Sequence, residues 1–199
     1  MAYTFTLIFQ INSAGSDVDA LVERLGEVGC DDALVGIGQP GRIALEFIRD
    51  ASNAREAMES ALGDVLRAIP TATLIEAAPD LVGITDVAEI TGVSRQNIRK
   101  LLISRSATAP LPVHAGNPSL WHLSDMLSWL EAELHYEVPL RTLEIALVAA
   151  KINIRKEAAR LHRDDDRCLA GLARGEQAAA EGRLVSHAEA TAQLKRWLV

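Results

Sequence analysis

The middle of the chain carries the side chains that are best suited to bind nucleic acid. From Ser94 to Ser124 the sequence contains no acidic residue and four basic ones, which are Arg95, Arg99, Lys100 and Arg105. Arginine and glutamine form paired hydrogen bonds with guanine and adenine edges in the major groove, and lysine binds phosphate. This segment therefore predicts a surface that binds double-stranded DNA.

The small and apolar residues of the same region predict two short helices joined by a tight turn. Ala88 is small where the second helix has to cross closely, and Gly92 permits the left-handed backbone of the turn. Val93 fills the corner, while Ile98 and Leu101 face inward from the second helix. This spacing predicts a helix-turn-helix whose second helix keeps its polar face exposed.

We expect the caps and the outer face of this motif to contact DNA. Thr85 is predicted to cap the first helix and Ser94 the second, where backbone N–H groups can hold phosphate. The predicted DNA-binding residues are Thr85, Ser94, Arg95, Gln96, Asn97, Arg99, Lys100 and Arg105. A structural helical hairpin that happens to have a basic face is the alternative interpretation.

The residues after the second helix predict a wing. We expect a strand over residues 110–115, a turn over 116–119, a strand over 120–123, and a helix capped by Ser124 that ends at Leu134. The predicted tip of the wing is formed by Gly116 and Asn117.

Residues 81–135 resemble the winged helix-turn-helix of MerR-type regulators and of the related excisionase-type DNA-binding domains. The resemblance rests on a proline-bearing wing strand, a strand that contains Trp121, and the helix Ser124–Leu134. It implies a sequence-specific, repressor-like transcription regulator. Separately, the sequence contains no cofactor motif, so we expect no cofactor. The helix Arg95–Leu102 would enter the major groove, and the wing would touch the backbone or the minor groove. This chain differs from the MerR pattern in two ways. Its motif lies in the middle of the chain, and the tip of its wing carries no Arg or Lys.

The first 78 residues predict a separate α+β domain. Apolar residues alternate from Tyr3 to Ile11, which is typical of a strand with one buried face. Further strands are predicted over residues 33–37, 43–48 and 71–76, and helices over 17–28 and 53–69. This order is that of a ferredoxin-like βαββαβ sandwich. The predicted domains are thus residues 1–78, the winged helix-turn-helix at 81–135, and a helical region at 138–199.

A long helix is predicted from about Pro139 to about Arg174. Apolar side chains recur in it at a seven-residue spacing, at Leu140, Leu147, Ile154 and Leu161. This repeat favours a homodimer that forms through the helix. A helix that packs on its own domain is the alternative, because Glu157 interrupts the coiled-coil pattern.

In the C-terminal tail the sequence predicts a short extended piece followed by a capping box between Ser186 and Glu189. The segment from Glu181 through Leu194 looks like the toxin-binding tail of small bacterial antitoxins. The predicted partner-binding residues are Val185, Leu194, Trp197 and Leu198. The alternative function is therefore an antitoxin that neutralises a toxin through this tail and autoregulates its operon. A helix that docks on the protein itself would explain the same pattern.

Composition argues against most other classes of protein. The 199 residues carry a net charge of −7, but the acidic residues concentrate in the first 80, with thirteen Asp and Glu against five Arg. No apolar run is long enough to span a bilayer, and the first ten residues lack the basic start of a signal peptide. We therefore expect a cytoplasmic protein. The five histidines and two cysteines form no ligand or nucleophile pattern, so we expect neither enzymatic activity nor a metal site.

Overall fold

The computed structural model describes residues 1–11, 18–182 and 191. Its contacts divide the chain into two units, Met1–Arg155 and Lys156–Val199. Within the first unit the described buried apolar residues form two separate cores, one under the N-terminal sheet and one among the helices that follow it. Among the described residues no helix is both long enough and apolar enough to cross a membrane.

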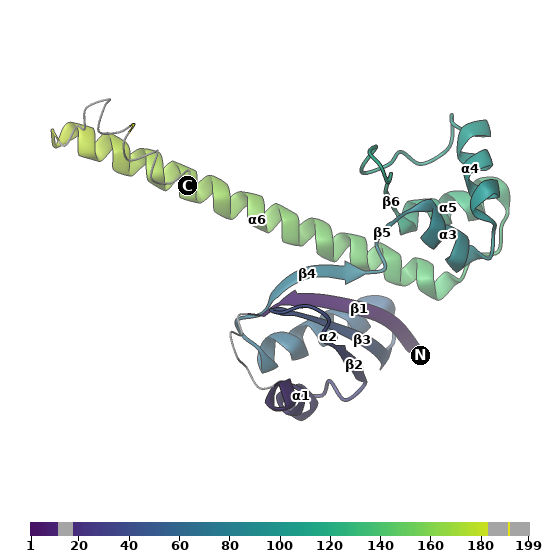
Figure 1. Cartoon of the computed structure of the whole chain (residues 1–199), viewed down its shortest axis with the longest axis horizontal. Helices are drawn as coiled ribbons and strands as arrows, with labels where there is room; N and C mark the ends of the chain where they lie inside the picture. Colours follow the sequence, from purple (N-terminus) through teal and green to yellow (C-terminus); the bar gives the residue numbers. More distant parts are fainter. Residues whose placement is uncertain (12–17, 183–190, 192–199) are drawn as a thin grey trace. The chain divides into compact units, whose positions relative to one another are not determined.

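The N-terminal sheet has four antiparallel strands in the order β2-β3-β1-β4 (Figure 1). Its elements are β1 (Ala2–Gln10), α1 (Val18–Glu27), β2 (Ala33–Gly36), β3 (Arg42–Asp50), α2 (Ala54–Ala68) and β4 (Thr73–Ala78). The central strands β1 and β3 pair over their whole length, from Ala2 opposite Asp50 to Gln10 opposite Arg42. The predicted α+β class and the order strand, helix, strand, strand, helix, strand are confirmed.

One face of this sheet is buried, because alternate side chains of a strand point to the same side. The buried apolar residues of the two central strands are Tyr3, Phe5, Leu7, Phe9, Ile43, Leu45 and Phe47. They share one core with Leu21 and Leu25 of α1 and with the buried face of α2, which includes Met58 and Val65. The alternation that predicted the first strand therefore also marks its core face.

A buried arginine ties three parts of this domain together. Arg49 at the end of β3 donates hydrogen bonds to Asp32, at 2.7 and 2.9 Å, and to Asp64 of α2, at 2.6 Å. The hydrogen bond to Asp32 is the main cause that raises the pKa of the Arg49 guanidinium, despite its burial. Nearby Cys30 is buried, and desolvation raises the pKa of its thiol to about 11. The second cysteine, Cys168, is exposed.

The second core is formed by three helices and a two-stranded sheet. The elements are β5 (Leu81–Val82), α3 (Ile84–Thr91), α4 (Arg95–Ser104), β6 (Trp121–His122) and α5 (Leu123–Leu134). The sheet pairs β5 with β6, so that Leu81 lies opposite His122. Val87, Ile98 and Leu127 are fully buried in this core.

The prediction of a wing strand over residues 110–115 is wrong. Only His114 forms a bridge, to Leu120, and residues 110–113 run without strand pairing. Proline lacks the N–H group that a strand ladder needs, and Pro110 instead accepts a hydrogen bond from the Trp121 indole at 3.2 Å. Trp121 itself pairs with β5, which the sequence did not reveal as a strand.

The last predicted helix of this region starts earlier than expected. Its N-cap is His122, not Ser124, and Ser124 is buried inside the first turn of α5. The helix ends at Leu134, as predicted.

The long helix α6 (Leu140–Ala180) belongs to both units. Inside the first unit it contributes Ile145, Ala149 and Ile152 to the core under the sheet, and Ala146 to the second core. One face of its first part is therefore packed on the same chain.

Asp80 joins the sheet to the helices that follow. It is 2% exposed, and its carboxylate lies 2.6 Å from Nδ1 of His122 and accepts a hydrogen bond from the Asn153 amide at 2.7 Å. The Asn153 side chain also bonds both the N–H and the carbonyl of Ala77, at 2.9 and 2.8 Å. The Asp80 carbonyl accepts from the N–H of Leu123 at 2.7 Å. Strand β4 thus extends to Ala78, two residues beyond its predicted end, held by Asn153 of α6.

The substitution Asp80→Ala should lower the free energy of unfolding by about 3 kcal/mol, because His122 and Asn153 would lose a buried charged partner. Urea denaturation followed by circular dichroism would measure the change. The control Asp31→Ala removes the same group from an exposed position and should change stability by less than about 0.5 kcal/mol. Equal effects of the two substitutions would show that the Asp80 contacts contribute nothing.

Candidate nucleic-acid interface

Helices α3 and α4 are joined by a three-residue turn with the expected local chemistry. Gly92 has φ of 69°, a left-handed conformation that glycine adopts without the steric cost other residues have. Ser94 is the N-cap of α4, and its hydroxyl accepts a hydrogen bond from the N–H of Asn97 at 3.3 Å. Ile98 is fully buried, as predicted, and fixes which face of α4 turns inward.

The start of α3 differs from the prediction. Gly83, not Thr85, is the N-cap, and its N–H donates to the Asp86 carboxylate at 2.7 Å. Thr85 is the second residue of the helix, and its side chain is exposed. The predicted cap at Thr85 is therefore wrong, because Asp86 already satisfies the first free N–H of the helix.

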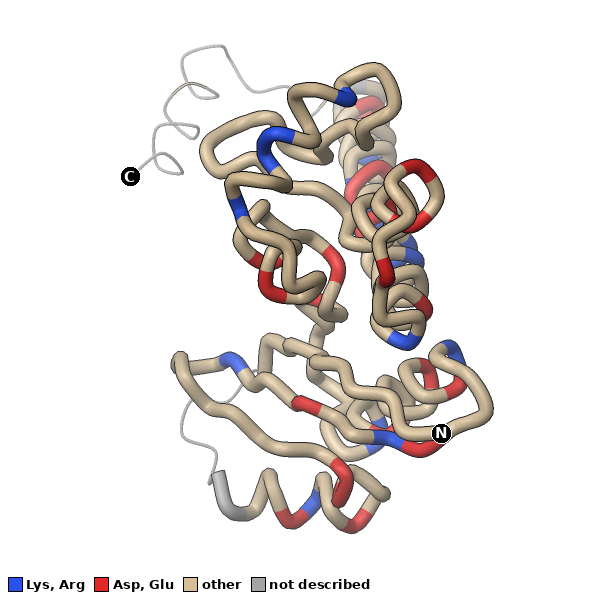
Figure 2. The backbone as a smooth tube through the Cα atoms, turned by 90° about the vertical axis from the view of Figure 1, so that its right-hand side faces the viewer, with Lys and Arg blue, Asp and Glu red and all other residues tan. Residues whose placement is uncertain are grey.

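The outward side chains of α4 form a basic face. Its exposed residues include Arg95, Gln96, Arg99 and Lys100. In the part of the chain that the structure describes, no ion pair involves the three cations of this face, whereas Arg49 and Arg67 of the N-terminal domain are paired with acids. Figure 2 shows how acidic and basic positions are distributed along the backbone. The charge on α4 is thus available to an external anion.

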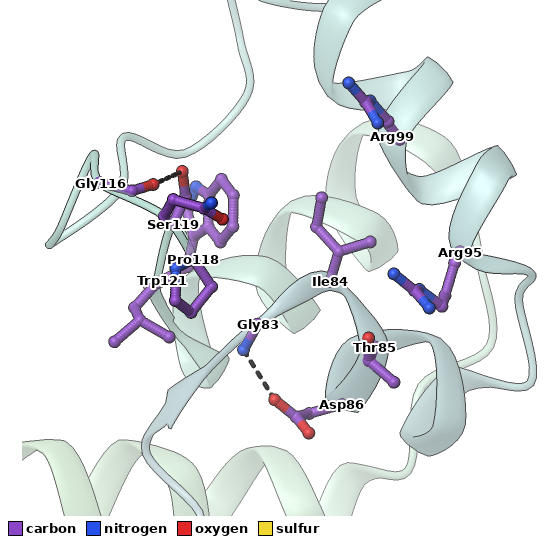
Figure 3. A pocket seen from close by; sticks show the side chains of 12 residues that line it. Gly83, Ile84, Thr85, Asp86, Arg95, Arg99, Gly116, Pro118, Ser119 and Trp121 are labelled. Atoms are coloured by element: carbon purple, nitrogen blue, oxygen red, sulfur yellow. Dashed lines mark hydrogen bonds between the residues drawn. The ribbon is translucent and has the colours of Figure 1, made fainter.

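A cavity of about 580 Å³ opens between these helices and the loop that precedes β6. Arg95 and Arg99 line it from α4, and Ile84 and Thr85 line it from α3. Figure 3 shows the two arginines on one side and Gly116, Pro118 and Ser119 on the other. Asp86 also lines the cavity, and its carboxylate accepts the hydrogen bond from the N–H of Gly83. With two guanidinium groups against this one carboxylate, the cavity suits an anionic chain such as a phosphodiester backbone.

The loop that was predicted as a wing is held by its own contacts. The Ser119 hydroxyl donates to the carbonyl of Gly116 at 3.0 Å. Gly116 packs so closely against the His114 ring that a Cβ atom at this position would collide with it. Gly116 and Asn117 are exposed at the tip. The loop therefore presents backbone and amide groups, without a charged side chain.

Two predicted DNA-binding residues lie away from this face. The amide of Asn97 is half-buried and donates to the Tyr136 hydroxyl at 3.1 Å, which links α4 to the segment before α6. Arg105 is the C-cap of α4, at the far end from the cavity. Tyr136 was missed by the sequence analysis, since a single tyrosine in a connector gives no pattern.

The remaining predicted sites fall in other parts of the chain. The predicted dimerisation residues Leu140, Leu147, Ile154 and Leu161 are exposed on α6. The predicted partner-binding residues Val185, Leu194, Trp197 and Leu198 lie outside the described residues. Over the described residues, no three His, Cys, Asp or Glu side chains are grouped as a metal site requires.

Comparison with known proteins found no matching family model, curated protein or solved structure.

The hydrogen bond between Asn97 and Tyr136 should stabilise the position of α4. Because the substitutions Asn97→Ala and Tyr136→Phe each remove this bond, each should lower the free energy of unfolding by about 1 kcal/mol. The double variant should lose about 1 kcal/mol less than the sum, since the same bond is lost only once. Urea unfolding of the four proteins measures this coupling. Strict additivity would show that the two side chains do not interact.

Proposed function

We propose that the chain is a sequence-specific DNA-binding transcription regulator, with residues 81–135 as a winged helix-turn-helix. The observation that carries this proposal is the outer face of α4, where Arg95, Arg99 and Lys100 are exposed without an acidic partner among the described residues. A structural hairpin needs no such face. Its cations would be expected to pair with nearby acids, as Arg49 and Arg67 do in the N-terminal domain.

In this proposal α4 is the recognition helix and lies in the major groove. Arg95 and Gln96 are in its first turn, where recognition helices contact base edges. Lys100 lies further along the helix and is better placed to bind phosphate. The N-terminus of α4 carries the positive end of the helix dipole, which also favours phosphate.

The loop from Gly116 to Ser119 takes the place of the wing. It lies across the cavity from Arg95 and Arg99, so one DNA strand can run between the loop and α4. Since the loop tip carries no cation, its contribution comes from backbone groups and the Asn117 amide. Affinity should then depend mainly on α4.

The acidic N-terminal domain would restrict which surface meets DNA. We propose a ferredoxin-like sandwich for it, supported by the strand order β2-β3-β1-β4 and by the shared core of the sheet with α1 and α2. Residues 1–80 carry thirteen acidic residues against five arginines, and this negative charge repels phosphate. Binding through α4 to an operator then represses transcription by occupying the site.

The experiment compares Arg95→Ala with Lys100→Ala. Arg95→Ala should weaken binding to a specific duplex by about 1 to 3 kcal/mol and have little effect on a scrambled one, because base contacts carry the specificity. Lys100→Ala should weaken both alike and reduce the salt slope by about one unit, because it removes one phosphate contact. Fluorescence anisotropy at three salt concentrations measures both effects.

The matched control is Arg24→Ala, which removes an exposed charge from α1 and should leave both affinities unchanged. Circular dichroism confirms that each variant is folded. The proposal is wrong if folded Arg95→Ala and Lys100→Ala proteins bind both duplexes like the unchanged chain.

A further inference from the structure

One face of α6 carries large apolar side chains that the described residues of the chain leave exposed. Leu140, Leu147, Ile154 and Leu161 follow one another at seven-residue intervals and are 62%, 41%, 57% and 56% exposed. We propose that these four residues, the α6 stripe, bind the α6 stripe of a second copy of this chain. This inference goes beyond DNA binding and does not depend on it.

Packing within the chain uses the face opposite the stripe and also one flank of the stripe, where Ala150 is buried and Leu143 is half-buried. Ile145, Ala149 and Ile152 are buried in the core under the sheet, together with residues of β1 and α2. Asn153 fixes the rotation of the helix through its bonds to Ala77 and Asp80. The α6 stripe therefore stays outside while the neighbouring face is buried. Helix α6 can therefore pack on its own domain through one face and pair with a second copy through the stripe.

The part of α6 that lies in the second unit also exposes large apolar side chains. Every residue from Glu157 to Gln177 is exposed, including Leu169 and Leu172, which are 64% and 62% exposed. Helices in proteins take most of their stability from the packing of an apolar face. A long helical segment that exposes leucines on this scale is expected to pack against another surface.

The spacing and the size of the stripe favour a second copy as that surface. A seven-residue repeat keeps its seam toward a partner that has the same repeat, and another copy of α6 supplies one. The exposed apolar face continues beyond the four stripe residues to Leu172, which lies five full turns after Ile154. From Leu140 to Leu172 the helix rises about 48 Å, and with a width of about 10 Å this extended face offers about 500 Å² per copy. A pair would bury about 1,000 Å², the lower size of a specific interface.

Charge does not oppose the pairing of two such helices. Helix α6 has eight basic and six acidic residues, whereas residues 1–80 are strongly acidic. Glu157, which interrupts the repeat, is paired with Lys156 at 3.1 Å and with Arg160 at 2.8 Å in the same helix. The negative charge of Glu157 is therefore compensated by Lys156 and Arg160 within the same helix.

The test is sedimentation velocity of the full chain at about 50 μM without DNA, together with two double variants. Ile154→Asp with Leu161→Asp places two carboxylates on the stripe, where both residues are exposed in the single chain. Ala159→Asp with Ala170→Asp places the same groups on the opposite side of the helix, also at exposed positions. We expect a dimer for the unchanged chain and for the Ala159/Ala170 variant. The stripe variant should associate about 100-fold more weakly or more.

Each other outcome contradicts the inference. A monomeric unchanged chain would leave the stripe to a different protein. A stripe variant that stays dimeric would place the interface elsewhere. Loss of the dimer in both variants would mean that helix stability, not the stripe, controls association. Circular dichroism of all three proteins shows whether the helix content is retained.

Discussion

The buried carboxylate of Asp80 is the interaction on which the arrangement of the first unit depends. A carboxylate that is almost fully removed from water is costly unless charged or polar groups surround it. His122 and Asn153 supply these groups, and each comes from a different element. The same residue provides, through its carbonyl, a partner for the N–H of Leu123 at the start of α5. One residue thus connects β4, α5 and α6.

The contacts of Asp80 also help to position the basic face of α4. Strand β5 begins directly after Asp80 and pairs with β6, and α3 begins directly after β5. Ile98 and Val87 then pack into the core that α5 completes, which turns Arg95 and Arg99 outward. Tyr136 also holds the first turn of α4, through its hydrogen bond with Asn97. The proposed DNA-reading surface is therefore held by the core and by this bond, while its cations keep no acidic partner among the described residues.

Much of the fold could be predicted because local chemistry and burial agree. The alternation from Tyr3 to Ile11 marks a strand, and it also marks the face that becomes the core. Gly92 and Ser94 predict the turn and the cap of α4, because both act on backbone groups next to them in sequence. These features need no knowledge of distant residues.

What could not be predicted depends on residues far apart in the chain. Asp80, His122 and Asn153 carry no common pattern, and only the folded chain brings them together. The pairing of Trp121 with β5 left residues 110–113 without a strand partner, although their sequence resembled a wing strand. Thr85 lost its predicted role as a cap because Asp86 reaches back to Gly83. The heptad repeat was visible in the sequence, but which side of α6 is buried was not.

The proposed recognition of a particular DNA sequence by the outer face of α4 can be tested most directly by selecting bound fragments from the genomic DNA of the source. The selection is carried out at physiological salt and the bound fragments are sequenced. The unchanged chain should enrich a small set of fragments that share a motif, and a variant with Arg95→Ala and Arg99→Ala should lose this enrichment while remaining folded. Recovery of fragments without a common motif, or the same motif from the variant, would contradict the account.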